Sequence, residues 1–193
     1  VLLLNFFRPS DEIGHYYAAA KTTGLVLFIL YAVGTAYAGR IAAAHALNKR
    51  NEIEHLVGEA VRWTFAPAAV ITLGILAIGY PVLAQFGETF TDAYPLMFIL
   101  AAGILTKAAM GPSETILNML GHQRASALSL GTAAVVAIVL NLILIPLWGV
   151  AGAAVATATA FVTVATINWL ALLRLEGLNL FILANLPRSK QES

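Results

Sequence analysis

Cysteine is absent from this 193-residue sequence, and charged side chains are scarce. Without cysteine, disulfide bonds and thiolate metal sites are excluded. Charged residues make up 11% of the chain and apolar residues 60%, whereas soluble domains carry about 25% charged residues. A soluble fold of this length could not hide so much apolar surface, because the surface area of a folded chain still grows with its size. The composition therefore predicts an integral membrane protein.

Several functional patterns are missing as well. The net charge of +1 gives no basic excess, so nucleic acid is not an expected partner. The sequence shows no paired carboxylates within an apolar stretch, no glycine-rich phosphate loop and no Ser–His–Asp cluster. Its histidines stand at the ends of apolar stretches or between them, without metal-ligand spacing. We therefore expect a protein that is not an enzyme and holds no metal or other cofactor.

Long apolar stretches are what the sequence does have. About 20 apolar residues, at 1.5 Å rise each, cross the ~30 Å hydrocarbon core of a bilayer. The sequence therefore predicts an all-α polytopic bundle within residues 1–177, followed by an interfacial segment and cytoplasmic tail over 178–193. The five complete spans are expected at about 17–44, 63–86, 93–120, 125–148 and 149–173.

The first seven residues, Val1 to Phe7, are apolar but too few to span a bilayer, and no basic segment precedes them. We interpret them as the end of a sixth helix. The chain is accordingly expected to be the C-terminal part of a longer protein.

The longest connection lies between the first two spans and has helical periodicity. Its apolar residues recur on one face of a helix over 51–62, with charged residues on the other positions. This pattern predicts an amphipathic helix that lies in the membrane interface. The alternative is a helix outside the membrane that packs on the bundle. The apolar positions are Ile53, Leu56, Val57, Ala60 and Val61.

Basic residues are distributed unequally between the two sides of the predicted bundle, and the side rich in Lys and Arg is expected to be cytoplasmic. The opposite side has Arg8 and Lys21 and carries most of the acids of the short loops. Because the C-terminus lies on the basic side, we expect it to be cytoplasmic. The residues of the basic side are Arg40, Lys49, Arg50, Arg62, Arg124, Arg174, Arg188 and Lys190.

Lys107 is the residue that most clearly suggests a function, since it lies roughly 20 Å into the third span by helical rise. An intramembrane charge costs several kcal/mol unless it faces a cavity or a partner. Glu114 and Asn118 follow Lys107 at helical spacing. Gly111-Pro112 predicts a break in the helix between Lys107 and Glu114. We expect these residues to line a substrate pathway. The alternatives are an internal Lys–Glu pair, or a span that ends before Glu114.

Two further basic residues stand near the ends of the first span. Arg40, near the cytoplasmic end, is expected either at the inner mouth of the pathway or extended toward lipid phosphates. Lys21, near the outer end, is interpreted as a membrane anchor whose side chain extends toward lipid phosphates.

Three segments resemble a known family. Residues 141–157 read NLILIPLWGVAGAAVAT, which is similar to the N-x-x-L-I-P-x-x-G-x-x-G-A-A-x-A-T signature of polysaccharide flippases. These O-antigen or teichoic-acid type transporters belong to the multidrug/oligosaccharidyl-lipid/polysaccharide exporter superfamily. Residues 13–20, IGHYYAAA, and 83–90, LAQFGETF, resemble a helix entry and an outer turn of the second lobe of these proteins.

The resemblance implies a two-lobe exporter that works by alternating access, of which this chain would be most of the second lobe. The implied activity is the flipping of undecaprenyl-diphosphate-linked oligosaccharide across the bacterial cytoplasmic membrane for cell-surface polysaccharide biosynthesis. Its partners would be membrane lipid, the lipid-linked glycan and the missing N-terminal lobe. A cationic cavity suits an anionic diphosphate. The alternatives are a multidrug cation antiporter of the same superfamily and a scaffold fragment that does not transport.

Overall fold

In the computed structural model, which describes Leu4 and residues 10–185, every regular element is helical. Five stretches of helix are long and apolar enough to cross a membrane, namely Glu12–Ala46, Arg50–Ala84, Thr89–Met119, Gln123–Trp148 and Val150–Leu175. The expected all-α polytopic bundle is therefore confirmed. In chain order the elements are α2 (Ser10–Gly24), α3 (Leu27–Ala46), α4 (Arg50–Ala84), η1 (Glu88–Ala93), α5 (Tyr94–Ala109), α6 (Ser113–Met119), α7 (Gln123–Trp148), α8 (Val150–Leu175) and η2 (Ile182–Ala184).

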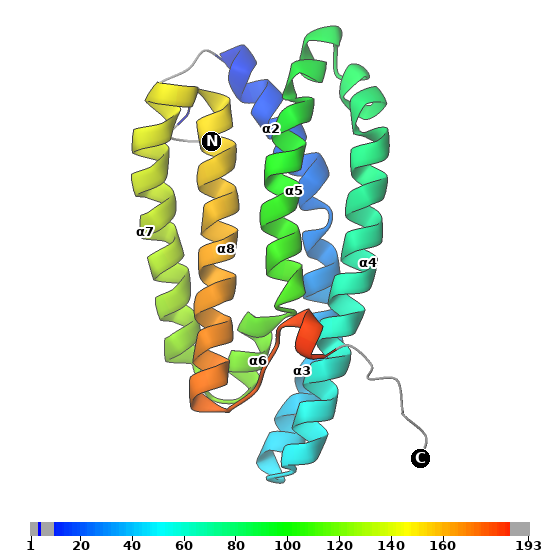
Figure 1. Ribbon diagram of the computed structural model, residues 1–193, viewed down its shortest axis with the longest axis vertical. Helices are drawn as coiled ribbons and strands as arrows, with labels where there is room; N and C mark the ends of the chain where they lie inside the picture. Colours follow the sequence, from blue (N-terminus) through cyan, green and yellow to red (C-terminus); the bar gives the residue numbers. More distant parts are fainter. Residues whose placement is uncertain (1–3, 5–9, 186–193) are drawn as a thin grey trace.

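The helices run roughly parallel to one long axis (Figure 1). The helices α7 and α8 form a tight hairpin, because only Gly149 separates them. Helix α5 packs on α8, α4 and α2, while α3 packs on α4 and α6. At one end, α3 and α4 extend together beyond the other helices (Figure 1).

Buried side chains form clusters at successive levels of the bundle. The first lies near the α7–α8 turn and contains Leu83, Met97 and Ile145. A middle cluster joins Val26 of α3's N-terminal cap to Ala68 of α4 and Ile104 of α5. The third surrounds the start of α4 and includes Leu56, Ile116 and Leu172. The described helices are thus packed against one another along the length of the bundle.

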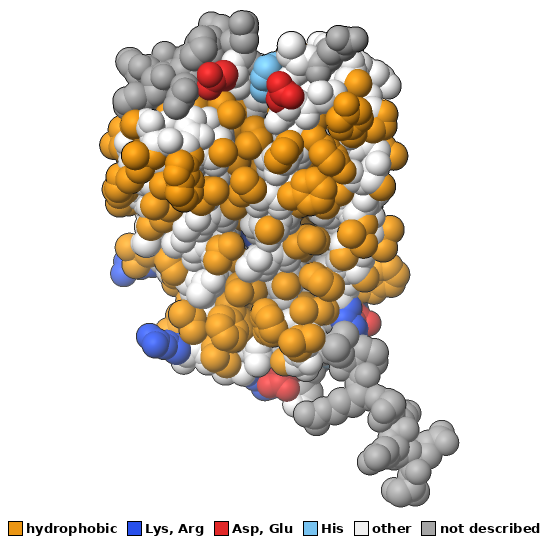
Figure 2. All heavy atoms as spheres, turned by 45° about the horizontal axis from the view of Figure 1, so that its top comes forward, with side chains coloured by type: hydrophobic (Ala, Val, Ile, Leu, Met, Phe, Trp, Pro, Cys, Tyr) orange, Lys and Arg blue, Asp and Glu red, His pale blue; other side chains and the backbone are white. Residues whose placement is uncertain are grey.

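The outer surface carries an apolar belt. Figure 2 shows hydrophobic side chains around the middle of the molecule, with acidic and histidine side chains at one end and basic side chains, together with acidic ones, at the other. Large apolar side chains are exposed on α7 and α4, where lipid is the solvent that would accept them. Examples are Leu128, Val135 and Leu147 on α7 and Val70 and Leu73 on α4.

The expected helix over 51–62 is not a separate interfacial element. It is continuous with the second span in α4, which runs without interruption from Arg50 to Ala84. The predicted apolar face, from Ile53 to Val61, is buried against the bundle, and its helical phase continues through Thr64 and Ala68. Residues 51–62 and the second span thus form one helix with one continuous buried stripe, and the location of residues 51–62 in the membrane interface stays a prediction.

The segment that follows α8 also packs on the bundle. Leu178, Leu180 and Ile182 are buried in the cluster around the start of α4. The rest of the expected tail, including Arg188 and Lys190, lies outside the described residues, as does the expected helix end before residue 8 apart from Leu4.

A polar network ties three chain segments together at this end of the bundle. Arg50 at the start of α4 donates a hydrogen bond to the carbonyl oxygen of Glu176, which follows α8. The same arginine forms an ion pair with the Glu176 carboxylate at 3.4 Å. The other carboxylate oxygen lies 2.7 Å from Nε2 of His122, in the turn before α7. We call Arg50, His122 and Glu176 the end clamp.

Candidate functional site

The third span is interrupted between α5 and α6. Helix α5 ends at Ala109 and α6 begins at Ser113. Gly111 between them has φ of 61°, a left-handed conformation that glycine adopts without strain. Pro112 has no amide hydrogen to continue the helical ladder. The interruption therefore coincides with the Gly-Pro pair in the sequence.

Neighbouring helices hold this interruption closely. A Cβ atom on Gly111 would lie 2.8 Å from Cγ2 of Val61 in α4. A Cβ atom on Gly34 of α3 would lie 2.9 Å from Oγ1 of Thr115 in α6. The chain can leave the helical path here because two glycines let α3 and α4 approach it.

Lys107 stands in the last turn of α5, directly before the interruption. It lines a cavity of about 30 Å³ together with Tyr31, Pro112 and Glu114. This volume is sufficient for one water molecule. The Lys107 Nζ atom lies 5.5 Å from the centre of the Phe161 ring of α8, a cation–π geometry. The ammonium group is thus placed between α3, α6 and α8, away from the exposed faces of α4 and α7.

Lys107 and Glu114 do not form the internal ion pair that was the alternative prediction. The ion pairs within 4 Å among residues 10–185 do not include them. Both side chains line the same cavity instead. The positive charge of Lys107 is therefore not neutralised by direct contact with this carboxylate.

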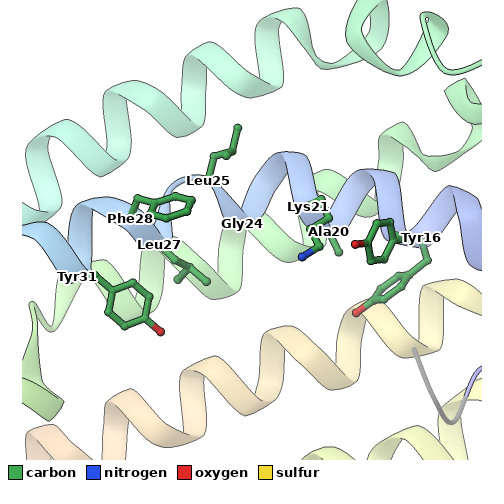
Figure 3. Close-up of a pocket in the computed structure, with 9 residues that line it drawn as sticks. Tyr16, Ala20, Lys21, Gly24, Leu25, Leu27, Phe28 and Tyr31 are labelled. Atoms are coloured by element: carbon green, nitrogen blue, oxygen red, sulfur yellow. The ribbon is translucent and has the colours of Figure 1, made fainter.

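A larger cavity, of about 630 Å³, adjoins the first one. The two cavities share Leu27 and Tyr31 in their linings. Figure 3 shows Tyr16 and Lys21 on the α2 side of this cavity and Leu27, Phe28 and Tyr31 on the α3 side, with α8 running alongside. Lys21 and Lys107 thus line two adjacent cavities. We call the two cavities together the lysine groove.

Helix α2 is tied to α8 beside this groove. The Tyr16 hydroxyl and Oγ1 of Thr157 are 2.8 Å apart and form a hydrogen bond. The Lys21 Nζ atom lies 5.3 Å from the centre of the Tyr17 ring. These contacts fix the α2 wall of the lysine groove relative to α8.

The other two predicted pathway residues do not line the groove. Asn118 is half-buried in α6, and its carbonyl oxygen accepts hydrogen bonds from the Gly121 amide and the Gln123 side chain. Arg40 is exposed near the end of α3 and lies 5.7 Å from the centre of the Tyr37 ring. The structure therefore brings together Lys107, Glu114 and the Gly111-Pro112 break, but not Asn118 or Arg40.

Sequence reasoning interpreted Lys21 only as a membrane anchor. The sequence signal for its place in the groove lining is helical spacing. Residues at intervals of three or four form one row, namely Tyr17, Lys21, Gly24, Phe28 and Tyr31. This row marks one face of the first span with a charge and aromatic rings. Among the residues that the structure describes, no group of His, Asp and Glu is arranged to hold a metal ion.

One comparison with known proteins gives a match. The chain is 27% identical over 166 residues to the "Probable low-salt glycan biosynthesis flippase Agl15" of Haloferax volcanii, and this alignment covers 83% of the chain. It covers 34% of that protein, so the chain spans about a third of the length of this curated relative. No protein-family model matches the chain. No solved structure matches it either. The five apolar helical stretches support a multi-pass membrane protein.

Proposed function

We propose that this chain forms one wall of the substrate pathway in a transporter that flips lipid-linked glycans. The observation that carries the proposal is the position of Lys107, at the interruption of the third span and in the lining of the lysine groove. The likeness to a protein named as a glycan biosynthesis flippase supports the same activity.

The energetics of a buried charge explain why Lys107 points to a ligand. A lysine at membrane depth costs about 3 kcal/mol or more on insertion scales, and such residues usually face a cavity or a partner. Here the described neighbours of the ammonium group include an aromatic ring but no carboxylate in direct contact. A phosphate group would supply a direct contact of negative charge, which the Glu114 carboxylate in the same lining does not make. A diphosphate on a lipid carrier fits this requirement.

The substrate is proposed to be a polyprenyl-diphosphate-linked oligosaccharide. This class includes the undecaprenyl carrier expected from the sequence resemblance, and it also accommodates the archaeal origin of the relative. The interrupted spans are consistent with transport, because discontinuous helices at the membrane midplane are typical of transporter binding sites. Alternating access would require a second lobe facing the lysine groove, which the greater length of the relative could supply.

The proposed orientation has the C-terminus in the cytoplasm of a multi-pass cytoplasmic-membrane protein. The described basic residues support it, since Lys49, Arg50, Arg124 and Arg174 all belong to the end of the bundle where α3, α6 and α8 finish. The transported glycan would then move from the cytoplasmic to the outer leaflet.

The test is transport by the full-length protein in liposomes loaded with a fluorescent polyprenyl-diphosphate glycan. Lys107→Ala is expected to lower the rate of flipping about tenfold or more, because a buried contact to an ionised group contributes roughly 1.5–3 kcal/mol. Lys107→Arg, which keeps the charge, should recover part of the rate. Lys49→Ala, which removes an exposed lysine from the start of α4, is the control. Wild-type flipping by Lys107→Ala would overturn the proposed role of this charge.

A further inference from the structure

The first span is interrupted between α2 and α3, where the sequence contains no proline. The amides of Leu25 and Val26 bond to the carbonyl oxygens three residues before them, and the amides of Phe28 and Ile29 do the same. In a regular α-helix the amide of Leu25 would bond to Lys21 and that of Phe28 to Gly24. The interruption therefore frees the carbonyl oxygens of Lys21 and Gly24 from their usual amide partners.

Free carbonyl groups at membrane depth are costly unless they face protein or a water-filled cavity. Lys21 and Gly24 both line the larger cavity of the lysine groove. At Gly24 an added Cβ atom would meet no heavy atom within 4 Å, so the space directly above the backbone is open. The cavity thus reaches down to the main chain at the interruption.

The side chains around this open backbone combine aromatic rings with hydrogen-bonding groups. Tyr17, Phe28 and Tyr31 present rings that are half or more exposed. Lys21 adds an ammonium donor next to the Tyr17 ring. Aromatic faces pack against the C–H faces of sugar rings, while phenol, ammonium and carbonyl groups bond to sugar hydroxyls. A sugar ring has both an apolar C–H face and hydroxyl groups, and this lining offers partners for each.

From these observations we infer that the cavity at the α2–α3 interruption binds sugar rings of the transported glycan, next to a phosphate position at Lys107. This inference rests on the proposed function and assigns the two parts of the substrate to two parts of the lysine groove. The volume of about 630 Å³ lies within the range of ligand-binding pockets. Leu27 and Tyr31 line both cavities, so the sugar position and Lys107 are neighbours in the fold.

The competing occupant is the polyprenyl chain of the carrier lipid. A hydrocarbon chain would make no use of the tyrosine hydroxyl groups or the Lys21 ammonium group in this lining, whereas sugar hydroxyls would bond to them. The exposed face of α7, which carries Leu128 and Val135, lacks such polar groups and suits acyl chains better.

The experiment measures the binding of two probes to the full-length protein in detergent. One probe is polyprenyl diphosphate, and the other is the same lipid bearing N-acetylglucosamine. The key variant is Gly24→Leu, which fills the open space above the interruption. Its control is Gly131→Leu on α7, where an added Cβ atom likewise meets nothing within 4 Å.

The wild-type protein is expected to bind the sugar-bearing probe more tightly than the sugar-free probe. Gly24→Leu should raise the dissociation constant of the sugar-bearing probe about tenfold and leave that of the sugar-free probe within about twofold. Phe28→Ala should have the same selective effect, and Tyr80→Ala on α4 should have none. Lys107→Ala should weaken the binding of both probes.

Equal effects of Gly24→Leu and Phe28→Ala on the two probes would overturn the sugar site and assign the cavity to the carrier lipid. Equal affinity of the wild-type protein for the two probes would overturn it as well. Failure of the wild-type protein to bind either probe would instead refute the proposed function, and the sugar site with it.

Discussion

The Nζ atom of Lys107 lies 5.5 Å from the centre of the Phe161 ring, and this contact links α5 to α8 beside the interruption of the third span. An aromatic face stabilises an ammonium group without neutralising its charge. Lys107 is thereby held in place and stays available to a negatively charged ligand.

The contact between Lys107 and Phe161 predicts that the aromatic ring of Phe161 supports transport, and that an aliphatic side chain of similar size does not replace it. Phe161→Leu should lower the rate of flipping by about threefold to tenfold, since a cation–π contact contributes ~0.5–2 kcal/mol depending on desolvation. Phe161→Tyr keeps the ring and should stay close to the wild-type rate. Phe98→Leu, at an exposed position of α5, is the matched control. An unchanged rate for Phe161→Leu would show that Lys107 does not depend on the ring.

A second prediction concerns water in the lysine groove. The described chain contains no cysteine, so single cysteines can be introduced into a cysteine-free background. Lys107→Cys should react with a charged, membrane-impermeant thiol reagent, because the cavities reach it. Val135→Cys, on the exposed face of α7, should react much more slowly because lipid covers that face. The reverse order of labelling rates would place position 107 against acyl chains and remove the basis of the proposed function.

A third prediction tests the conformation at the helix interruption. Gly111→Ala should lower the free energy of unfolding by about 1–3 kcal/mol, because alanine is strained at positive φ. Its methyl group would also meet Val61 of α4. Thermal unfolding in detergent measures the loss, and the additional change Val61→Ala should restore part of it. Gly131→Ala in the middle of α7 should be neutral or slightly stabilising, since alanine favours helix by up to ~1 kcal/mol.

A fourth prediction concerns the end clamp. Glu176→Gln removes the carboxylate that contacts both Arg50 and His122 and should destabilise this end by about 1–3 kcal/mol. Hydrogen exchange should become faster in residues 178–182, which pack on the start of α4. Glu52→Gln breaks the exposed Lys49–Glu52 pair and should change stability by less than ~1 kcal/mol. Equal effects of the two changes would show that the clamp has no special role.

The membrane fold could be predicted because the length and the composition of the apolar stretches determine it. The stretches 125–148 and 149–173 differ by only a few residues from α7 and α8. Their apolar runs are complete, and Gly149 marks the turn between them. The interruption at residues 110–112 could be predicted for a similar local reason, since Gly-Pro cannot continue a helix.

The features that sequence reasoning missed arise from tertiary contacts or from weak local signals. The α2–α3 interruption has no proline, and the nearest signals are Thr22 and Thr23, whose hydroxyls bond to the carbonyl oxygens four residues before them. Such bonds often bend helices. The continuity of α4 depends on neighbours that bury one face of residues 50–62. Asn118 was predicted to share a face with Lys107, but the interruption between α5 and α6 shifts the helical phase.

The uninterrupted course of α4 has a mechanical consequence. At 1.5 Å per residue, its 35 residues extend over roughly 52 Å, well beyond the ~30 Å hydrocarbon core. One end of this rod holds Arg50 of the end clamp, and the other leads into η1, where Thr89 lies 3.3 Å from His15 of α2. The end clamp and the contact between η1 and α2 are thus joined through a single helix, so a rigid-body tilt of α4 would move both.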